Sequence, residues 1–176
     1  MANKHAVLSA SSAARWIACP PSARLNAAKP DAPSEYAAQG TDAHTLCEYK
    51  LRKALGTKVR DPTKNLASYD TEMEECAEAY CQFVMELVGQ FRAESKDTMV
   101  SVEQRVDFSG FVPDGFGTAD TLIISGKTVC IVDYKHGKGI EVSADRNPQM
   151  MCYALGCIQM FDGLYDIDNV RMVIFQ

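Results

Sequence analysis

Residues 128–135 (Thr-Val-Cys-Ile-Val-Asp-Tyr-Lys) are apolar almost without interruption until the segment ends in charged residues. A half-buried strand alternates apolar and polar residues, whereas a strand covered on both faces is apolar nearly throughout. This segment therefore predicts a central strand with other elements packed on both of its faces. A chain that builds such a strand folds as an α/β domain, with a sheet between helices.

The rest of the chain supplies both kinds of element. Up to about residue 95 the pattern predicts helices, a short one over about 13–17 and longer ones over about 34–55 and 71–94,. Residues 99–106 and 117–124 predict two strands, and Ser125-Gly126-Lys127 predicts a tight turn into the central strand,. A loop over 136–139, a helix over about 147–160 and a strand over 170–175 complete the predicted order.

Length and composition indicate one ordinary globular domain over residues 1–176, with 47% hydrophobic and 23% charged residues,. Its helical part covers about 9–95, and its strands and last helix cover about 98–176. The sequence stops inside the last predicted strand, so we expect a domain truncated at its C-terminus. No apolar run is long enough to cross a membrane and no signal peptide is present, which favours the cytoplasm. The seven cysteines form no Cys-x-x-Cys pair, which indicates reduced thiols,.

Two aspartates and a lysine form the candidate chemical site. Asp120 and Asp133 lie six to seven positions on either side of the predicted turn, so they can face each other across the strand pair,. Two close carboxylates repel unless a cation lies between them, and a hard divalent cation is the usual solution. Lys135 follows Asp133 at i+2 and points to the same face, where an ammonium group can orient water or stabilise developing charge. Tyr134 points away, although its backbone carbonyl could be a further metal ligand.

These residues belong to a longer ordered pattern. It includes Gly40-x-x-x-His44, Gly117-x-x-Asp120, the strand ending in Asp133-Tyr134-Lys135, and Gln149-x-x-x-Tyr153 on a predicted helix. The opening Leu8-Ser9-Ala10-Ser11, with Arg15-Trp16 and Cys19-Pro20, adds to it. The whole pattern resembles the RecB-like branch of the PD-(D/E)XK nuclease superfamily, over about residues 8–153. More narrowly, it resembles an uncharacterised phage and prophage family of that branch.

The resemblance implies a restriction-endonuclease-like core, with a central mixed sheet flanked by helices. It implies that His44, Asp120 and Asp133 bind Mg²⁺ or Mn²⁺ with help from the Tyr134 carbonyl, and that Asp120, Asp133 and Lys135 are catalytic. Gln149 and Tyr153, at i and i+4 on one helix face, would contact the nucleic-acid strand.

Each of these residues also has an ordinary structural interpretation. His44 can be a surface or capping histidine, and Tyr153 a core aromatic residue. Glu103 could add a carboxylate to the site or simply face solvent. Cys19 stands where some relatives place the first iron–sulfur ligand, but no trio of C-terminal cysteines follows, so we do not expect this chain to assemble a cluster on its own,.

The expected function is metal-dependent hydrolysis of DNA, as an exonuclease in phage or prophage recombination or DNA processing in a bacterial host cell. The net charge of −5 opposes purely electrostatic binding of DNA, although bound metal would neutralise carboxylates locally,. Two alternatives remain, a nucleic-acid-binding module without turnover and a metal-binding structural module of a phage assembly. A homo-oligomer or a recombination partner is compatible with each.

Overall fold

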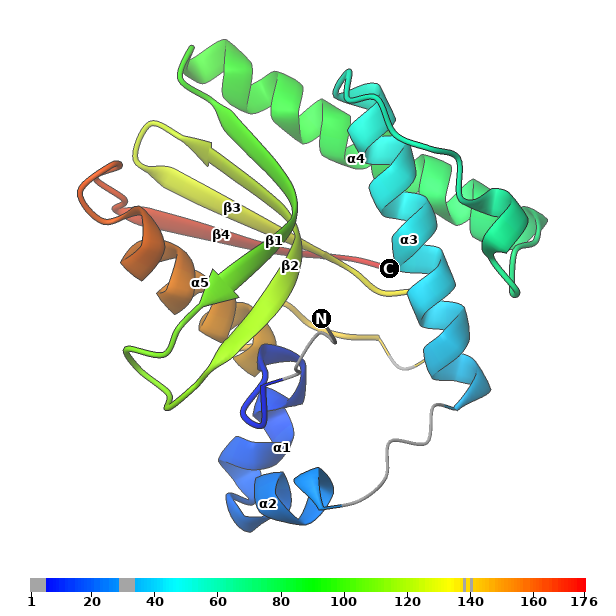
Figure 1. The fold of residues 1–176 in the computed structure, drawn as a ribbon. Helices are drawn as coiled ribbons and strands as arrows, with labels where there is room; N and C mark the ends of the chain where they lie inside the picture. Colours follow the sequence, from blue (N-terminus) through cyan, green and yellow to red (C-terminus); the bar gives the residue numbers. More distant parts are fainter. Residues whose placement is uncertain (1–5, 29–33, 138, 140) are drawn as a thin grey trace.

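The computed structural model describes residues 6–28, 34–137, 139 and 141–176. In it, a four-stranded sheet lies between two layers of helices (Figure 1). The strands β1 (Met99–Asp107), β2 (Phe116–Ser125), β3 (Thr128–Tyr134) and β4 (Asn169–Phe175) follow one another across the sheet. The first three are antiparallel, and β4 runs parallel to β3 after the helix α5 (Pro148–Phe161). The expected mixed sheet flanked by helices is confirmed, and it is compatible with a restriction-endonuclease-like core.

Two long helices, α3 (Glu35–Ala54) and α4 (Thr71–Glu94), pack on one face of the sheet. Each begins at a side chain that accepts a hydrogen bond from the first turn: Ser34 from the amide of Ala37, and Asp70 from the amide of Met73,. Their buried residues meet the side chains of β3 that point to this face, among them Cys130 and Val132. A 3₁₀ turn, η2 (Thr63–Asn65), lies in the connection between the two helices.

The other face is covered by α5 and by the N-terminal η1 (Ala10–Ser12) and α1 (Ala13–Ala18). Helix α5 begins at Pro148, because Asn147 accepts hydrogen bonds from the next two free amides and proline suits the first helical position,. A short helix, α2 (Pro21–Ala27), follows α1 and was not predicted. It begins at the Pro20-Pro21 pair, directly after the end of α1.

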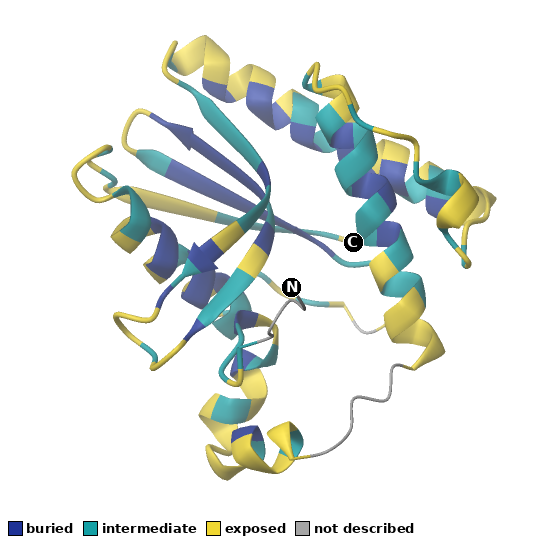
Figure 2. Ribbon diagram, viewed as in Figure 1, coloured by how far each residue is buried: buried dark blue, intermediate teal, exposed yellow. Residues whose placement is uncertain are grey.

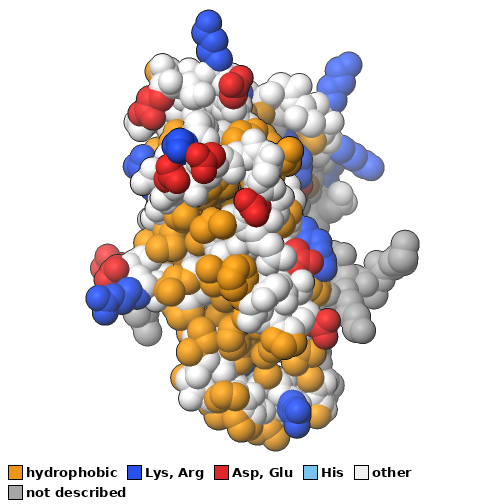
Figure 3. All heavy atoms as spheres, turned by 90° about the vertical axis from the view of Figure 1, so that its left-hand side faces the viewer, with side chains coloured by type: hydrophobic (Ala, Val, Ile, Leu, Met, Phe, Trp, Pro, Cys, Tyr) orange, Lys and Arg blue, Asp and Glu red, His pale blue; other side chains and the backbone are white. Residues whose placement is uncertain are grey.

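Strand β3 is the buried centre of the domain, as its apolar sequence predicts. All of its residues after Thr128 are buried, and they alternate between the two helical layers. Figure 2 shows the buried positions on the central strands and on the inner sides of the helices. Figure 3 shows hydrophobic side chains gathered on the face at the left of Figure 1, where α5 lies. Within the described residues, no helix is both long and apolar enough to span a membrane.

Candidate metal centre

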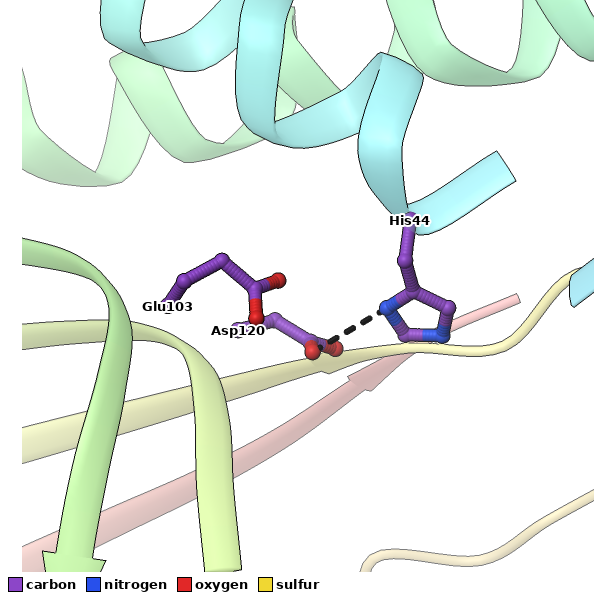
Figure 4. A group of neighbouring side chains, drawn as sticks. All are labelled: His44, Glu103 and Asp120. Atoms are coloured by element: carbon purple, nitrogen blue, oxygen red, sulfur yellow. Dashed lines mark ion pairs between the residues drawn. The ribbon is translucent and has the colours of Figure 1, made fainter. Parts of the chain in front are cut away.

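Three side chains from different elements meet beside the C-terminal end of β3, midway along β1 and β2. His44 comes from α3, Glu103 from β1 and Asp120 from β2 (Figure 4), and one ligand atom of each lies within 4.8 Å of the other two. Nδ1 of His44 is 3.1 Å from Oδ1 of Asp120. Two carboxylates and an imidazole at such distances could hold a metal ion.

An interruption of the β1–β2 ladder brings Glu103 into this group. The strands pair up to Val102 opposite Thr121 and again from Gln104 opposite Ala119, so Glu103 and Asp120 are left out of the pairing. Glu103 has φ of +52°, in the left-handed region that a glutamate rarely adopts,. Such strained backbone is held in place by its surroundings and is concentrated at functional sites.

The interruption exchanges the faces of both strands. On β1, Val102 packs toward α3 and α4 whereas Val106 packs toward α5, although both are at even positions. On β2, Thr121 bonds to Tyr80 of α4, whereas Ala119 packs on the α5 side. Side chains alternate strictly in a regular strand, so one unpaired residue on each strand is needed for this exchange.

Asp120 is held by a second strand as well. Its Oδ2 accepts a hydrogen bond of 2.6 Å from the backbone amide of Tyr134. Tyr134 lies two residues beyond Val132, which forms the last pair of the β2–β3 ladder with Thr121. The Tyr134 ring points to the α3–α4 side and makes an edge contact with the His44 ring, 5.5 Å between centroids. The amide of Tyr134 thus orients Asp120 and its ring supports His44. The role of its carbonyl as a ligand stays a prediction.

Asp133 and Lys135 point to the α5 side, where Gln149 holds them together. Gln149 donates from Nε2 to Oδ1 of Asp133 (2.8 Å) and accepts at Oε1 from Nζ of Lys135 (3.0 Å). Lys135 Nζ also lies 2.9 Å from Oδ2 of Asp133, an ion pair in which this oxygen makes no well-directed hydrogen bond. Asp133 is buried, so its Oδ2 is an acceptor with capacity to spare.

Tyr153 connects α5 to β2 beside these groups. Its side chain is only 2% exposed, and its hydroxyl donates a hydrogen bond of 2.6 Å to the carbonyl of Thr118. Gly117 leaves room for the ring, because a Cβ at that position would lie 2.9 Å from Cε1 of Tyr153. In this structure Tyr153 is a buried residue that fixes α5 to β2 beside the site. Its contact with nucleic acid stays a prediction.

Six of the side chains that the sequence pattern indicates line one cavity of about 300 Å³, together with Ser9 and Ser11 of the N-terminal segment. They are His44, Asp120, Asp133, Lys135, Gln149 and Tyr153. Glu103 lines an adjoining cavity of about 600 Å³, which shares His44 and Ser11 with the first. Cys19 is an exposed free thiol at the end of α1.

The crowding of carboxylates changes the proton affinity of the site. Burial, and then the charge of Asp120, raises the pKa of Glu103 to about 7. The same two causes raise the pKa of Asp133 above its ordinary value, although Lys135 opposes them. Burial alone would lower the pKa of His44, but the hydrogen bond and charge of Asp120, with the other carboxylates, outweigh it and raise that pKa. The site therefore attracts positive charge, as protons or as a cation.

Fold and site together define an α/β protein with an acidic, histidine-containing candidate metal centre beside the end of its central strand. The chain belongs to the family described as "Protein of unknown function (DUF2800)", whose model matches residues 5–176. No solved structure matches the chain significantly.

Proposed function

We propose that this protein is a metal-dependent nuclease with a RecB-like PD-(D/E)XK site, which hydrolyses phosphodiester bonds of DNA. The observation that carries the proposal is the single cavity lined by residues spread along the chain from His44 to Tyr153. These residues resemble a nuclease motif in kind and in order. We further propose that it acts as an exonuclease in phage or prophage DNA processing.

The donor set fits Mg²⁺ or Mn²⁺. Carboxylate oxygens from Glu103 and Asp120 suit a hard cation, and the His44 imidazole favours Mn²⁺ over Mg²⁺ among the two,. Asp133 adds an under-used buried oxygen in the same cavity as Asp120 and His44. When bound, such an ion would polarise a phosphoryl oxygen and make water a stronger nucleophile.

Lys135 is the group of this chain best placed to act on the reacting atoms. Its ammonium group has three N–H donors, and among the described residues its polar partners are Asp133 and Gln149,. The side chain is 32% exposed and lines the cavity, so one donor remains to hold a water molecule or a phosphate oxygen. A fixed cation at that point stabilises the negative charge that develops during phosphodiester cleavage.

The experiment that tests this proposal compares linear and circular DNA incubated with Mg²⁺ or Mn²⁺. Wild type is expected to degrade the linear DNA, whereas Asp133→Ala and Lys135→Ala are expected to lose at least about 99% of the activity, as loss of a transition-state donor does elsewhere. Lys127→Ala and Asp166→Ala are matched controls, because these two residues form an exposed ion pair of 2.6 Å beyond the cavity lining.

Each other outcome has a distinct meaning. DNA degradation by both the Asp133→Ala and the Lys135→Ala variant would show that these residues are not catalytic. Cleavage of circular DNA as fast as linear DNA would point to an endonuclease. Binding of metal and DNA without any cleavage would favour the binding module without turnover, and binding of metal alone would favour a structural role.

A further inference from the structure

Beside the candidate site, a second hollow of about 850 Å³ opens between the N-terminal segment and the helices α1 and α2. Its lining is almost entirely apolar and includes Val7, Leu8, Trp16, Ile17, Pro20 and Leu25, which we call the N-terminal groove. Val7, Ile17 and Leu25 are each more than half exposed. The lower end of the face in Figure 3, at the level of α1 and α2 in Figure 1, is mainly hydrophobic. Single exposed apolar residues are common, but a concave set of them indicates a binding surface.

The N-terminal groove and the candidate site share a wall. Ala6, Ser9 and Ser11 line the site cavity, whereas Val7 and Leu8, from the same stretch of chain, line the groove. The segment from residue 6 to residue 11 therefore borders both hollows. This continuity favours an occupant that is part of the substrate over an unrelated partner.

Trp16 gives the groove its chemical preference. Its Nε1, the one polar atom of the side chain, donates a hydrogen bond of 2.9 Å to the carbonyl of Ser9,. The rest of the ring is apolar; it packs partly against the core on the α5 side and also lines the groove. Arg24 lines the same groove and adds a positive charge. Aromatic faces with neighbouring arginines are the platforms on which single-stranded nucleic acids stack their bases.

We propose that the N-terminal groove binds the bases of single-stranded DNA whose phosphates enter the candidate site. The inference rests on the proposed nuclease function and names its substrate as a single strand or an unpaired end. Bases inside a duplex are stacked on each other and cannot lie on a protein ring, whereas unpaired bases can. The guanidinium group of Arg24 would contact a phosphate of the bound strand.

The fluorescence of Trp16 tests this directly, because it is the one tryptophan of the chain. The full chain is titrated at low ionic strength in EDTA, where metal-dependent cleavage cannot occur, with a 12-residue oligothymidylate and with an abasic oligomer of the same length. We expect quenching by the oligothymidylate and little by the abasic strand. Labelled-oligonucleotide anisotropy should show that Trp16→Leu weakens binding by about fivefold or more, the loss typical of one stacked base.

Two further variants keep the test sharp. Leu25→Glu places a negative charge in the groove at a residue that is 64% exposed, so it should weaken binding without unfolding the chain. Leu164→Ala, at a residue 75% exposed that does not line the groove, is the matched control and should bind as wild type does. Equal quenching by both oligomers, or unchanged affinity in Trp16→Leu and Leu25→Glu, would overturn the groove assignment. Base-dependent quenching in a protein that cleaves no DNA would support base binding in the groove and contradict the nuclease function. Cleavage without quenching would support the nuclease function and contradict base binding in the groove.

Discussion

Nδ1 of His44 lies 3.1 Å from Oδ1 of Asp120, so that a helix and a strand of adjacent layers meet at one carboxylate. The other oxygen of Asp120 accepts the amide of Tyr134 from the next strand. Asp120 therefore connects α3, β2 and β3. A cation bound by His44, Glu103 and Asp120 would hold α3, β1 and β2 together beside β3, and its binding would stabilise the fold as a whole.

We expect Mn²⁺ to raise the melting temperature of the wild type and not that of Asp120→Asn. An ion at one hundred times its Kd stabilises the folded state by about 2.7 kcal/mol, which corresponds to roughly 5–10 °C for a domain of this size. Asparagine keeps an oxygen for the amide of Tyr134, so the variant should still fold. Differential scanning fluorimetry in EDTA and in Mn²⁺ measures the effect. Asp166→Asn, at an 80% exposed residue, should respond as wild type does; a response in Asp120→Asn would place the ion elsewhere.

The metal-free protein should lose stability as the pH rises from about 5 to 8. The pKa values of Glu103 (about 7), Asp133 and His44 are all raised in the folded state. A group whose folded pKa is raised stabilises the fold fully below its unfolded pKa, and this contribution is lost as the pH rises through the folded pKa. All three groups therefore act in the same direction. Melting temperatures in EDTA across this range give the slope, which Glu103→Gln should make shallower; an unchanged slope would contradict the raised pKa.

Affinity for Mn²⁺ should change with pH in the opposite sense. Glu103 and His44 must lose their protons before they can bind a cation, so binding should tighten as the pH rises through about 7,. Isothermal titration calorimetry in buffers of different ionisation enthalpy measures the protons released per ion. Release that is the same in wild type and in Glu103→Gln would remove Glu103 from the ligand set.

Gln149→Ala should lower nuclease activity without unfolding the protein. The amide of Gln149 holds Asp133 and Lys135 in place, and removal of such an outer-shell partner typically costs about 10- to 100-fold in activity or metal affinity,. The apparent KM for DNA should change little if positioning is its main role. Gln159→Ala, an exposed glutamine on the same helix, is the control. A large rise in KM with unchanged kcat would make Gln149 a substrate contact instead.

Two glycines should respond to alanine in opposite ways. A Cβ at Gly156 of α5 would collide with Val106 and lie 2.8 Å from the carbonyl oxygen of Asp107, a backbone atom that cannot move aside. We expect Gly156→Ala to destabilise the fold by about 1–3 kcal/mol. Gly89 of α4 has open space around it, so Gly89→Ala should stabilise by about 0.5–1 kcal/mol through helix propensity,. Urea denaturation of both variants decides; destabilisation by Gly89→Ala would contradict the packing described.

The elements with strong local signals were predictable from the sequence. Ser34 and Asp70 cap α3 and α4 where helical periodicity begins, and the apolar run after Gly126 became the buried strand β3. Helix α2 was missed because it is short and begins at a proline pair that also marks the end of α1. The six motif residues stand out in the sequence, and they line one cavity because the order of strands fixes their relative positions.

The place of Glu103 could not be derived in this way. Val100, Val102 and Val106 all stand at even positions of β1, so the pattern suggests one unbroken strand in which these three valines share a face. Both faces of the sheet are covered, and Val102 and Val106 are therefore buried on whichever side they point. Periodicity carries no information about an exchange of faces when both faces are apolar. Only the positive φ and the missing pair opposite Asp120 reveal it.

The spread of the metal-binding group along the chain also bears on how the protein folds. His44 reaches the group from a helix, and Glu103 meets Asp120 only after β1 and β2 have paired around their unpaired residues. A chain in which α3 has not yet docked on the sheet lacks one of the three donors. Tight metal uptake is therefore a late event, and divalent cations should slow unfolding far more than they speed refolding.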